Sequence, residues 1–266
     1  MKTNYPKKSL GQNFLVDKNI INKIIEIGNI NNNKTVMEIG SGYGNLTEAI
    51  SCKKPKKIFA VEKDKKLYSF LKKNFENCKN IKLINNDILN IIKNENLDKK
   101  IIVFGNLPYN ISTQILAKFI LLEKWPPWYE VLILMFQKEV ANRIIAKSNT
   151  REYGRISILS SWKCKITKVK DIKPSSFYPK PKIESTILLF EPKDEYFAIN
   201  KASNLEHITN IFFNQRRKMI KKPIKLIFKN SLEICKKLNL NENNRPQNLS
   251  PNTYYEICRE YEKLTN

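Results

Sequence analysis

Short apolar runs alternate with helical patterns through the first two-thirds of the chain. Each run is apolar at successive positions, which is typical of a parallel strand buried on both faces. The runs predict strands at Thr35–Ile39, Ile58–Glu62, Ile81–Asn85, Ile101–Gly105 and Val131–Phe136. Between and before them, helical spacing covers Asp17–Ile27 (with Asp17 as N-cap), Asn45–Lys53, Asp64–Phe75, Ser112–Leu122 and Gln137–Lys147. This alternation predicts an α/β fold with a mostly parallel sheet and helices on both faces.

The pattern changes near residue 163. Cys164–Ile172 and Ser185–Phe190 have strand-like spacing with a proline-rich loop between them, which predicts an antiparallel hairpin at the sheet edge. A linker, Glu191–Tyr196, comes next, and Asn204–Glu262 then has helical spacing, broken at Pro223 and near Arg245-Pro246. The expected organisation is therefore a larger domain over residues 1–192 and a small all-helical domain over residues 197–266.

The composition narrows the class of partner. The chain has 266 residues, 41% of them hydrophobic, and a formal net charge of +23, so it is expected to fold and to bind an acidic partner. An A+T-rich coding bias does not explain the charge, because it favours Glu as well as Lys. We expect a polyanion such as nucleic acid rather than a membrane surface.

Other compositional features argue for a cytoplasmic protein. No apolar run approaches the ~20 residues of a membrane span, and no apolar signal core follows the basic N-terminus. The five cysteines form no C-x-x-C pair and the single histidine is His207, so neither a metal site nor a disulfide framework is expected.

Glycines follow the first predicted strand at Gly40, Gly42 and Gly44. Such a loop lets the backbone turn tightly and approach a ligand closely. Its spacing is not the G-x-G-x-x-G of dinucleotide folds, and no P-loop Lys-Ser/Thr follows. Glu62, at the end of the second strand, is placed to accept hydrogen bonds from ribose hydroxyls. A ribose contact without a phosphate cradle indicates a nucleoside cofactor such as S-adenosylmethionine.

Asp87, just past the third predicted strand, is placed to accept a hydrogen bond from the adenine amine of that cofactor. The alternative interpretation is that Glu62 and Asp87 only cap the helices that follow them.

The tetrapeptide Asn106-Leu107-Pro108-Tyr109 follows the fourth strand, at the same edge as the glycine loop. The exocyclic amine of a base is a poor nucleophile because its lone pair is delocalised. The Asn106 side-chain oxygen and a backbone carbonyl near Leu107 or Pro108 are candidate acceptors for its hydrogens. Pro108 fixes the turn, and Tyr109 offers a face on which a flipped base stacks.

On these motifs the chain resembles the KsgA family of small-subunit rRNA adenine dimethyltransferases over almost its whole length. The opening Lys7–Leu15 is similar to the family's N-terminal signature, which implies that Asn13 and Leu15 contact the cofactor. Phe177–Ser185 resembles the F-x-P-x-P-K-V-x-S loop, which implies that Phe177 packs against the target base, although a plain core aromatic is the alternative. The cofactor residues that motif and resemblance together indicate are Asn13, Leu15, Gly40, Gly42, Glu62, Asp87 and Asn106.

Two C-terminal motifs favour this family over the similar erythromycin-resistance methyltransferases of the large subunit. Phe213–Lys218 and Arg245–Ser250 resemble the family's F-x-Q-R-R-K and R-A-E-x-L-S. The chain departs from the family pattern at Met219, Pro223, Pro246 and Gln247.

Asn214–Lys229 carries seven basic residues and no acid. A solvated helix face is the usual interpretation of such a run, but the resemblance favours contact with the rRNA backbone. The candidate RNA contacts are Arg216, Arg217, Lys218, Lys221 and Lys222. A second basic strip is expected from Lys163, Lys165, Lys168, Lys170, Lys173, Lys180 and Lys182.

The resemblance implies a Rossmann-like class I methyltransferase sheet and S-adenosylmethionine as methyl donor, with no metal. Its substrate would be two adjacent adenosines in the 3′-terminal hairpin of 16S rRNA, each dimethylated at its exocyclic amine by a monomeric enzyme on the assembling small subunit. Two alternatives stay open: an assembly factor that works by binding and release, and methylation of large-subunit rRNA.

Overall fold

The computed structural model describes residues 12–93 and 100–265, and the chain forms two compact units. The sheet unit comprises Met1–Lys118, Pro126–Ala141 and Ile166–Pro192. The helical unit comprises Phe119–Trp125, Asn142–Lys165 and Lys193–Asn266. One change of unit thus falls after Pro192, but the helical unit also includes two segments from within residues 1–192.

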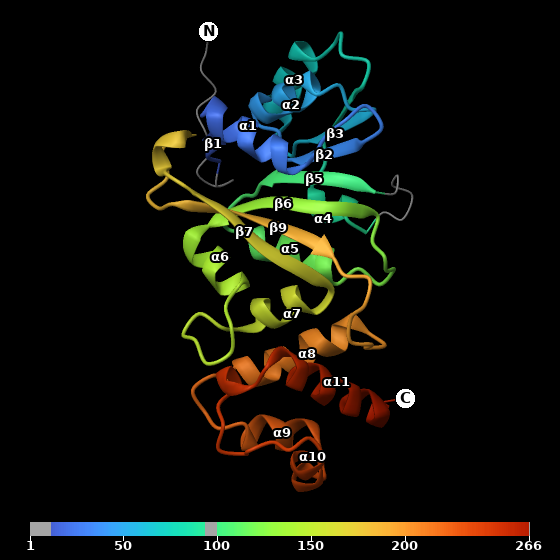
Figure 1. The fold of residues 1–266 in the computed structure, drawn as a ribbon, viewed down its shortest axis with the longest axis vertical. Helices are drawn as coiled ribbons and strands as arrows, with labels where there is room; N and C mark the ends of the chain where they lie inside the picture. The colour runs from blue at the N-terminus through green and yellow to red at the C-terminus, as the bar shows by residue number, and fades with distance from the viewer. Residues whose placement is uncertain (1–11, 94–99, 266) are drawn as a thin grey trace. The chain divides into compact units, whose positions relative to one another are not determined.

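A seven-stranded sheet forms the centre of the first unit in the described part of the chain, with strand order β4-β3-β2-β5-β6-β9-β7 (Figure 1). Its strands are β2 (Thr35–Ile39), β3 (Lys57–Val61), β4 (Ile81–Ile84), β5 (Ile101–Asn106), β6 (Tyr129–Gln137), β7 (Cys164–Ile172) and β9 (Ser185–Pro192). Strands β2 to β6 pair in parallel, and β9 is antiparallel to β6. The predicted mostly parallel sheet is confirmed, and the two late strands occupy its edge.

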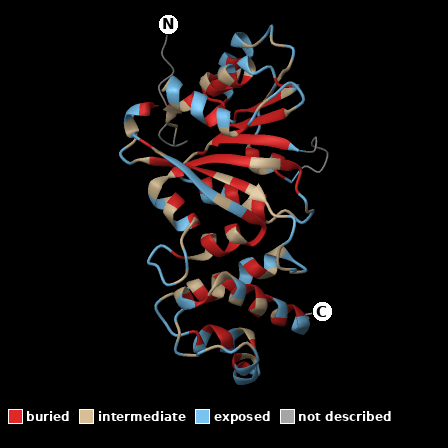
Figure 2. Cartoon of the chain, in the orientation of Figure 1, coloured by how far each residue is buried: buried red, intermediate tan, exposed pale blue. Residues whose placement is uncertain are grey.

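Both faces of the sheet are covered. All five residues of β2 are buried, and the central strands are buried along most of their length in Figure 2. The helices that connect the strands are α1 (Lys18–Ile27), α2 (Asn45–Cys52), α3 (Lys65–Asn74), α4 (Ile88–Ile91), α5 (Ser112–Ile120) and α6 (Lys138–Ile144). The predicted N-cap is confirmed, because the Asp17 carboxylate accepts hydrogen bonds from the backbone N–H of Asn19 and of Ile20.

A second, two-stranded sheet ties the start of the described chain to the proline-rich loop. β1 (Phe14–Leu15) pairs antiparallel with β8 (Phe177–Tyr178), so that Phe14 lies opposite Tyr178 and Leu15 opposite Phe177. A 3₁₀ turn, η2 (Pro174–Ser176), precedes β8, and the Ser176 hydroxyl donates a hydrogen bond to Asp17 over 3.0 Å. Two segments whose paired residues are 162 and 164 positions apart in sequence therefore lie together beside the main sheet.

The helical unit has its own hydrophobic core, which includes buried side chains such as Trp162, Phe212 and Tyr254. Its elements are α7 (Arg155–Lys163), α8 (Ala202–Phe213), α9 (Lys221–Ile227), α10 (Ser231–Lys237), the 3₁₀ turn η3 (Pro246–Asn248) and α11 (Pro251–Thr265). Because α7 contributes buried side chains to this core together with α8 and α11, residues 142–165 belong to the helical unit.

Pro223 does not interrupt a helix, contrary to the expectation from sequence. It is the third residue of α9 and is buried. A proline in the first turn is tolerated because its missing N–H would have no partner within the helix.

Lys163 is not part of a basic surface strip, which corrects the expectation for that residue. Its side chain is buried, and its Nζ lies 4.3 Å from the centroid of the Trp162 ring and 5.0 Å from that of Trp125. The ammonium also donates a hydrogen bond to the Leu122 carbonyl over 3.0 Å. Burial lowers the pKa of Lys163, and cation–π contacts with the surrounding rings compensate part of the lost hydration.

Candidate active site

A pocket lies where the carboxyl ends of two adjacent parallel strands meet. β2 leads into the glycine loop and β5 ends at Asn106, and Ile39 pairs with Gly105 across them. The lining includes three residues expected from sequence to hold a cofactor: Leu15, Gly40 and Asn106. This is the edge of an open α/β sheet at which ligands bind.

The glycine loop has the tightly turned backbone that its three glycines predict. Gly40, Gly42 and Gly44 all have positive φ, at 74°, 57° and 86°. A Cβ on Gly42 would lie 2.6 Å from Cδ1 of Phe14, so a side chain at residue 42 meets both strain and a clash. The loop therefore packs closely against the Phe14 side chain of β1 at Gly42.

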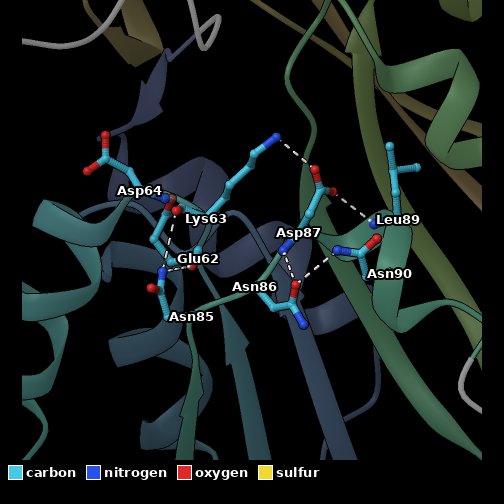
Figure 3. Close-up of polar contacts among 8 residues, drawn as sticks. All are labelled: Glu62, Lys63, Asp64, Asn85, Asn86, Asp87, Leu89 and Asn90. Carbon is cyan, nitrogen blue, oxygen red and sulfur yellow. Dashed lines mark hydrogen bonds and ion pairs between the residues drawn. The ribbon is translucent and has the colours of Figure 1, made fainter.

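Glu62 holds this loop in place (Figure 3 shows its neighbours). Its carboxylate accepts hydrogen bonds from the N–H of Gly42 over 2.9 Å and from the N–H of Asp64 over 2.8 Å. Glu62 is only 7% exposed, and burial raises its pKa. The N-cap of α3 is Asp64, not Glu62. The alternative interpretation of Glu62 as a helix cap is thus wrong, and each carboxylate oxygen retains a further lone pair for a ribose hydroxyl.

Asp87 does cap a helix. Its carboxylate accepts a hydrogen bond from the N–H of Leu89, in the first turn of α4, over 2.9 Å. Lys63 Nζ lies 2.7 Å from the other carboxylate oxygen (Figure 3). Partial burial raises the pKa of Asp87, but the Lys63 ammonium and the Leu89 N–H outweigh it and the net pKa is lowered. Asp87 is therefore ionised at neutral pH, and both of its carboxylate oxygens act as acceptors.

Asn106 has a fixed side-chain orientation. Its Nδ2 donates a hydrogen bond to the backbone carbonyl of Asn13 over 2.6 Å. Because the nitrogen is used in this way, the amide oxygen is presented on the other side of the group as an acceptor. Leu107 is buried and Pro108 is half-buried. The structure thus brings Asn13 and Asn106 together, 93 residues apart in sequence.

Tyr109 is also anchored. Its hydroxyl lies 2.8 Å from Ser185 Oγ, at the start of β9, and burial raises its pKa. Phe177 is only 4% exposed and packs in the same core cluster as Leu15, whereas its neighbour Tyr178 is 59% exposed. Phe177 therefore occupies a core position in this structure, which is the alternative interpretation of this residue.

Two polar contacts in this region, one buried and one part-buried, were not predicted from the sequence. The Thr47 hydroxyl donates a hydrogen bond to Glu38, which lines the pocket. The Asn45 side-chain amide donates to the Leu15 carbonyl over 2.8 Å. The signal for the first was available, since Glu38 is a charged residue in the middle of an otherwise apolar strand.

The candidate RNA contacts lie in and before α9, within the helical unit. Arg217, Lys218, Lys221 and Lys222 are exposed. Arg216 is half-buried and donates hydrogen bonds to the Gln247 side chain over 3.3 Å and to the Arg151 carbonyl. Lys221 Nζ lies 3.6 Å from Glu242. The exposed cations of this group, apart from Lys221 with its Glu242 contact, are therefore Arg217, Lys218 and Lys222.

Residues 12–93 and 100–265 lack two kinds of feature. They contain no cluster of three or more His, Cys, Asp or Glu side chains arranged for a metal ion. They also contain no helix long and apolar enough to cross a membrane.

Comparison with known proteins identifies the family of the chain. The family model for ribosomal RNA adenine dimethylase matches residues 3–263. The chain is 54% identical to ribosomal RNA small subunit methyltransferase A of Pelagibacter ubique over 258 residues, which cover 97% of each chain.

Solved structures support the same conclusion. A dimethyladenosine transferase from Plasmodium falciparum matches with a TM-score of 0.76 and 27% identity, over 94% of this chain and 98% of that one. The 23S rRNA methyltransferase ErmE, at 20% identity, shows the fold alone, with a TM-score of 0.67 over 94% of this chain and 99% of its own. The predicted Rossmann-like class I methyltransferase fold is confirmed, and the chain belongs to the ribosomal RNA adenine dimethylase family.

Proposed function

We propose that this protein transfers methyl groups from S-adenosylmethionine to two adjacent adenosines in the 3′-terminal hairpin of 16S rRNA. Each exocyclic amine is dimethylated, and the enzyme acts in the cytoplasm as a monomer on the assembling small subunit. The observation that carries this proposal is Asn106, whose amide is oriented by Asn13 at the wall of the pocket. Family membership and the small-subunit enzyme from Pelagibacter ubique support the substrate.

The residues that follow β2, β3 and β4 fit a nucleoside cofactor. Gly40 and Leu15 line the pocket, and Gly42 lets the loop approach it. Glu62 and Asp87 supply carboxylate oxygens for the ribose hydroxyls and the adenine amine, and Asn13 contributes from the segment before β1. S-adenosylmethionine, when bound, supplies a methyl group on an already activated sulfonium.

The residues of the protein then position the exocyclic amine of the adenosine. The Asn106 oxygen and a carbonyl near Leu107 or Pro108 accept the two amine hydrogens, which directs the nitrogen lone pair toward the methyl group. Tyr109, held by Ser185, offers its ring to the flipped base. The family resemblance implies that Phe177, whose ring is buried in this structure, packs against the same base. On transfer the methylated nitrogen would become cationic and acidic, while the sulfonium would leave as a neutral thioether. The nitrogen can then release its proton to water, so no side chain needs a pKa tuned for proton abstraction, and positioning supplies most of the rate.

The helical unit supplies sequence-independent contacts to rRNA. Arg216, Arg217, Lys218, Lys221 and Lys222 face phosphate groups, which fix position and register rather than base identity. Within this set the exposed Arg217, Lys218 and Lys222 contribute most, since Arg216 and Lys221 have partners in the protein.

The decisive test is transfer of labelled methyl groups to small subunits purified from a strain that lacks this modification. We expect the label to be recovered as dimethyladenosine in the 3′-terminal fragment of 16S rRNA. Label on naked large-subunit rRNA instead would contradict the proposed substrate. Cofactor binding without transfer to either RNA would favour a factor that acts by binding alone.

A further inference from the structure

Four aromatic rings gather at the outer side of the glycine loop, in the sheet unit. Phe14 and Tyr43 have ring centroids 4.5 Å apart, and Tyr43 and Phe70 have centroids 5.7 Å apart. Tyr178 lies opposite Phe14 in the β1–β8 pair. We call Phe14, Tyr43, Phe70 and Tyr178 the aromatic platform. Its members come from β1, the glycine loop, α3 and β8, so the fold assembles it from four separate segments.

The platform is partly open to solvent. Tyr178 is 59% exposed and Phe70 is 39% exposed, although Leu67 and Leu71 of the same helix are buried. Tyr178 is close enough to Tyr43 to add to the rise in the pKa of Tyr43 that burial causes. Apolar surface that is exposed and clustered in this way commonly marks an interaction site.

Positive charge surrounds the exposed rings. Lys66 and Lys73 lie four residues before and three residues after Phe70, so they share its face of α3. Both are exposed, and α3 contains no acidic residue. Lys180, two residues beyond Tyr178, is exposed as well. Aromatic faces bordered by cations are the combination that binds single-stranded nucleic acid, because each base stacks while its phosphate is neutralised.

The platform adjoins the pocket. Phe14 and Tyr43 belong both to the platform and to the pocket lining that includes Asn106. A base on Phe70 and Tyr178 would therefore be a close neighbour of the nucleotide whose amine reaches Asn106. A small ligand bound in the pocket would not contact the ring on α3, whereas an RNA strand that leaves the pocket would pass over the platform and contact it.

We propose that the aromatic platform stacks an unpaired rRNA nucleobase next to the methylated adenosines. This inference rests on the proposed function and extends it, since it names a second binding position for the same RNA strand. The platform then acts in substrate binding and does not touch the transferred methyl group.

Substitutions at Phe70 and Tyr178 test the proposal. Phe70→Ala and Tyr178→Ala are each expected to raise the KM for small subunits by roughly 5- to 150-fold, the usual effect of losing one stacked base. The kcat at saturating subunits and the Kd for S-adenosylmethionine should stay unchanged. Phe70→Trp should restore the KM, while Phe70→Leu should not, because leucine keeps the apolar area but has no aromatic face. Val169→Ala, at a 37% exposed residue on β7, is the matched surface control.

Three results would overturn the proposal. One is a KM unchanged in both alanine variants. Another is full activity in Phe70→Leu, which would mean that apolar area alone suffices. The third is a parallel loss of S-adenosylmethionine binding, which would assign the rings to the cofactor. A separate measurement distinguishes the two proposals. The affinity for a labelled single-stranded RNA, measured by fluorescence anisotropy, should be lower in the alanine variants even if the wild type methylates no subunits.

Discussion

At the scale of single residues, the oriented amide of Asn106 makes the strongest prediction. Asn106→Ala removes the acceptor for the amine and should lower kcat by about 100-fold or more, the usual effect of losing one preorganised hydrogen-bonding group. Asn106→Asp keeps an oxygen at that position but loses the donor to the Asn13 carbonyl, so it should retain more activity than alanine. Single-turnover methyl transfer measures both, with cofactor affinity measured by calorimetry. Full turnover by Asn106→Ala would remove the residue from the mechanism.

Glu38 makes a prediction about pH and stability. Burial raises the pKa of Glu38 from 4.5 to about 8, against the lowering effect of the Thr47 hydroxyl. Between these pH values the folded chain holds a proton that the unfolded chain has released, so the free energy of unfolding falls as pH rises. Glu38→Gln removes this titration while keeping an oxygen for Thr47.

Denaturant unfolding from pH 5 to pH 9 checks the Glu38 prediction. The stability of Glu38→Gln minus that of the wild type should grow with pH, by an amount on the order of a few kcal/mol. Groups that titrate in both proteins cancel in this difference. An equal pH dependence in the two proteins would show that Glu38 is ionised in the fold.

At the scale of elements, the loop between β2 and α2 depends on a bare backbone at Gly42. Gly42→Ala places a Cβ against the Phe14 ring at a φ of 57°, so β1 or the loop must shift. We expect a loss of about 1–3 kcal/mol in stability and a weaker affinity for S-adenosylmethionine. Gly154→Ala, where the nearest atom to the added Cβ is the Glu152 carbonyl oxygen at 4.0 Å, is the control and should leave cofactor affinity unchanged. Unaltered cofactor binding in Gly42→Ala would argue against the loop's role.

The same elements show how far the sequence alone predicts the fold. The apolar run Thr35–Ile39 is β2 with identical bounds, because a strand buried on both faces leaves a clear local signal. Helix α7 was not predicted: it buries two serines and a lysine, so its apolar residues show little helical periodicity. The β1–β8 pair was not predicted either, since the residues that it pairs are 162 and 164 positions apart in sequence.

The candidate site, like the fold, is predicted only in part by the sequence. Residue types at strand ends identify Gly40, Glu62 and Asn106, but the contacts that orient them are long-range. Only the fold shows that Asn13 orients Asn106, or that Glu62 holds the glycine loop. Sequence therefore predicts which groups take part, and the structure shows what fixes them.

At the scale of the whole molecule, the net charge of +23 is far more than the pocket needs. When these positive charges neutralise the phosphate groups of a polyanionic substrate, counterions are released from the phosphates. Binding is then steeply dependent on salt concentration. The exposed Arg217 and Lys222 should account for part of this dependence, whereas the charge of Lys237 is already paired with Glu260 at 2.7 Å.

The double variant Arg217→Ala and Lys222→Ala tests this use of charge. If each cation contacts one phosphate, the slope of log KM against log salt should decrease by about one unit per residue. The kcat at saturating small subunits should stay unchanged, because the reacting groups are elsewhere in the chain. Lys237→Gln is the control and should leave the slope as it is in the wild type. A uniform loss of slope in both variants would mean that the helical unit contributes only overall charge, whereas a loss confined to the double variant would assign it defined phosphate contacts.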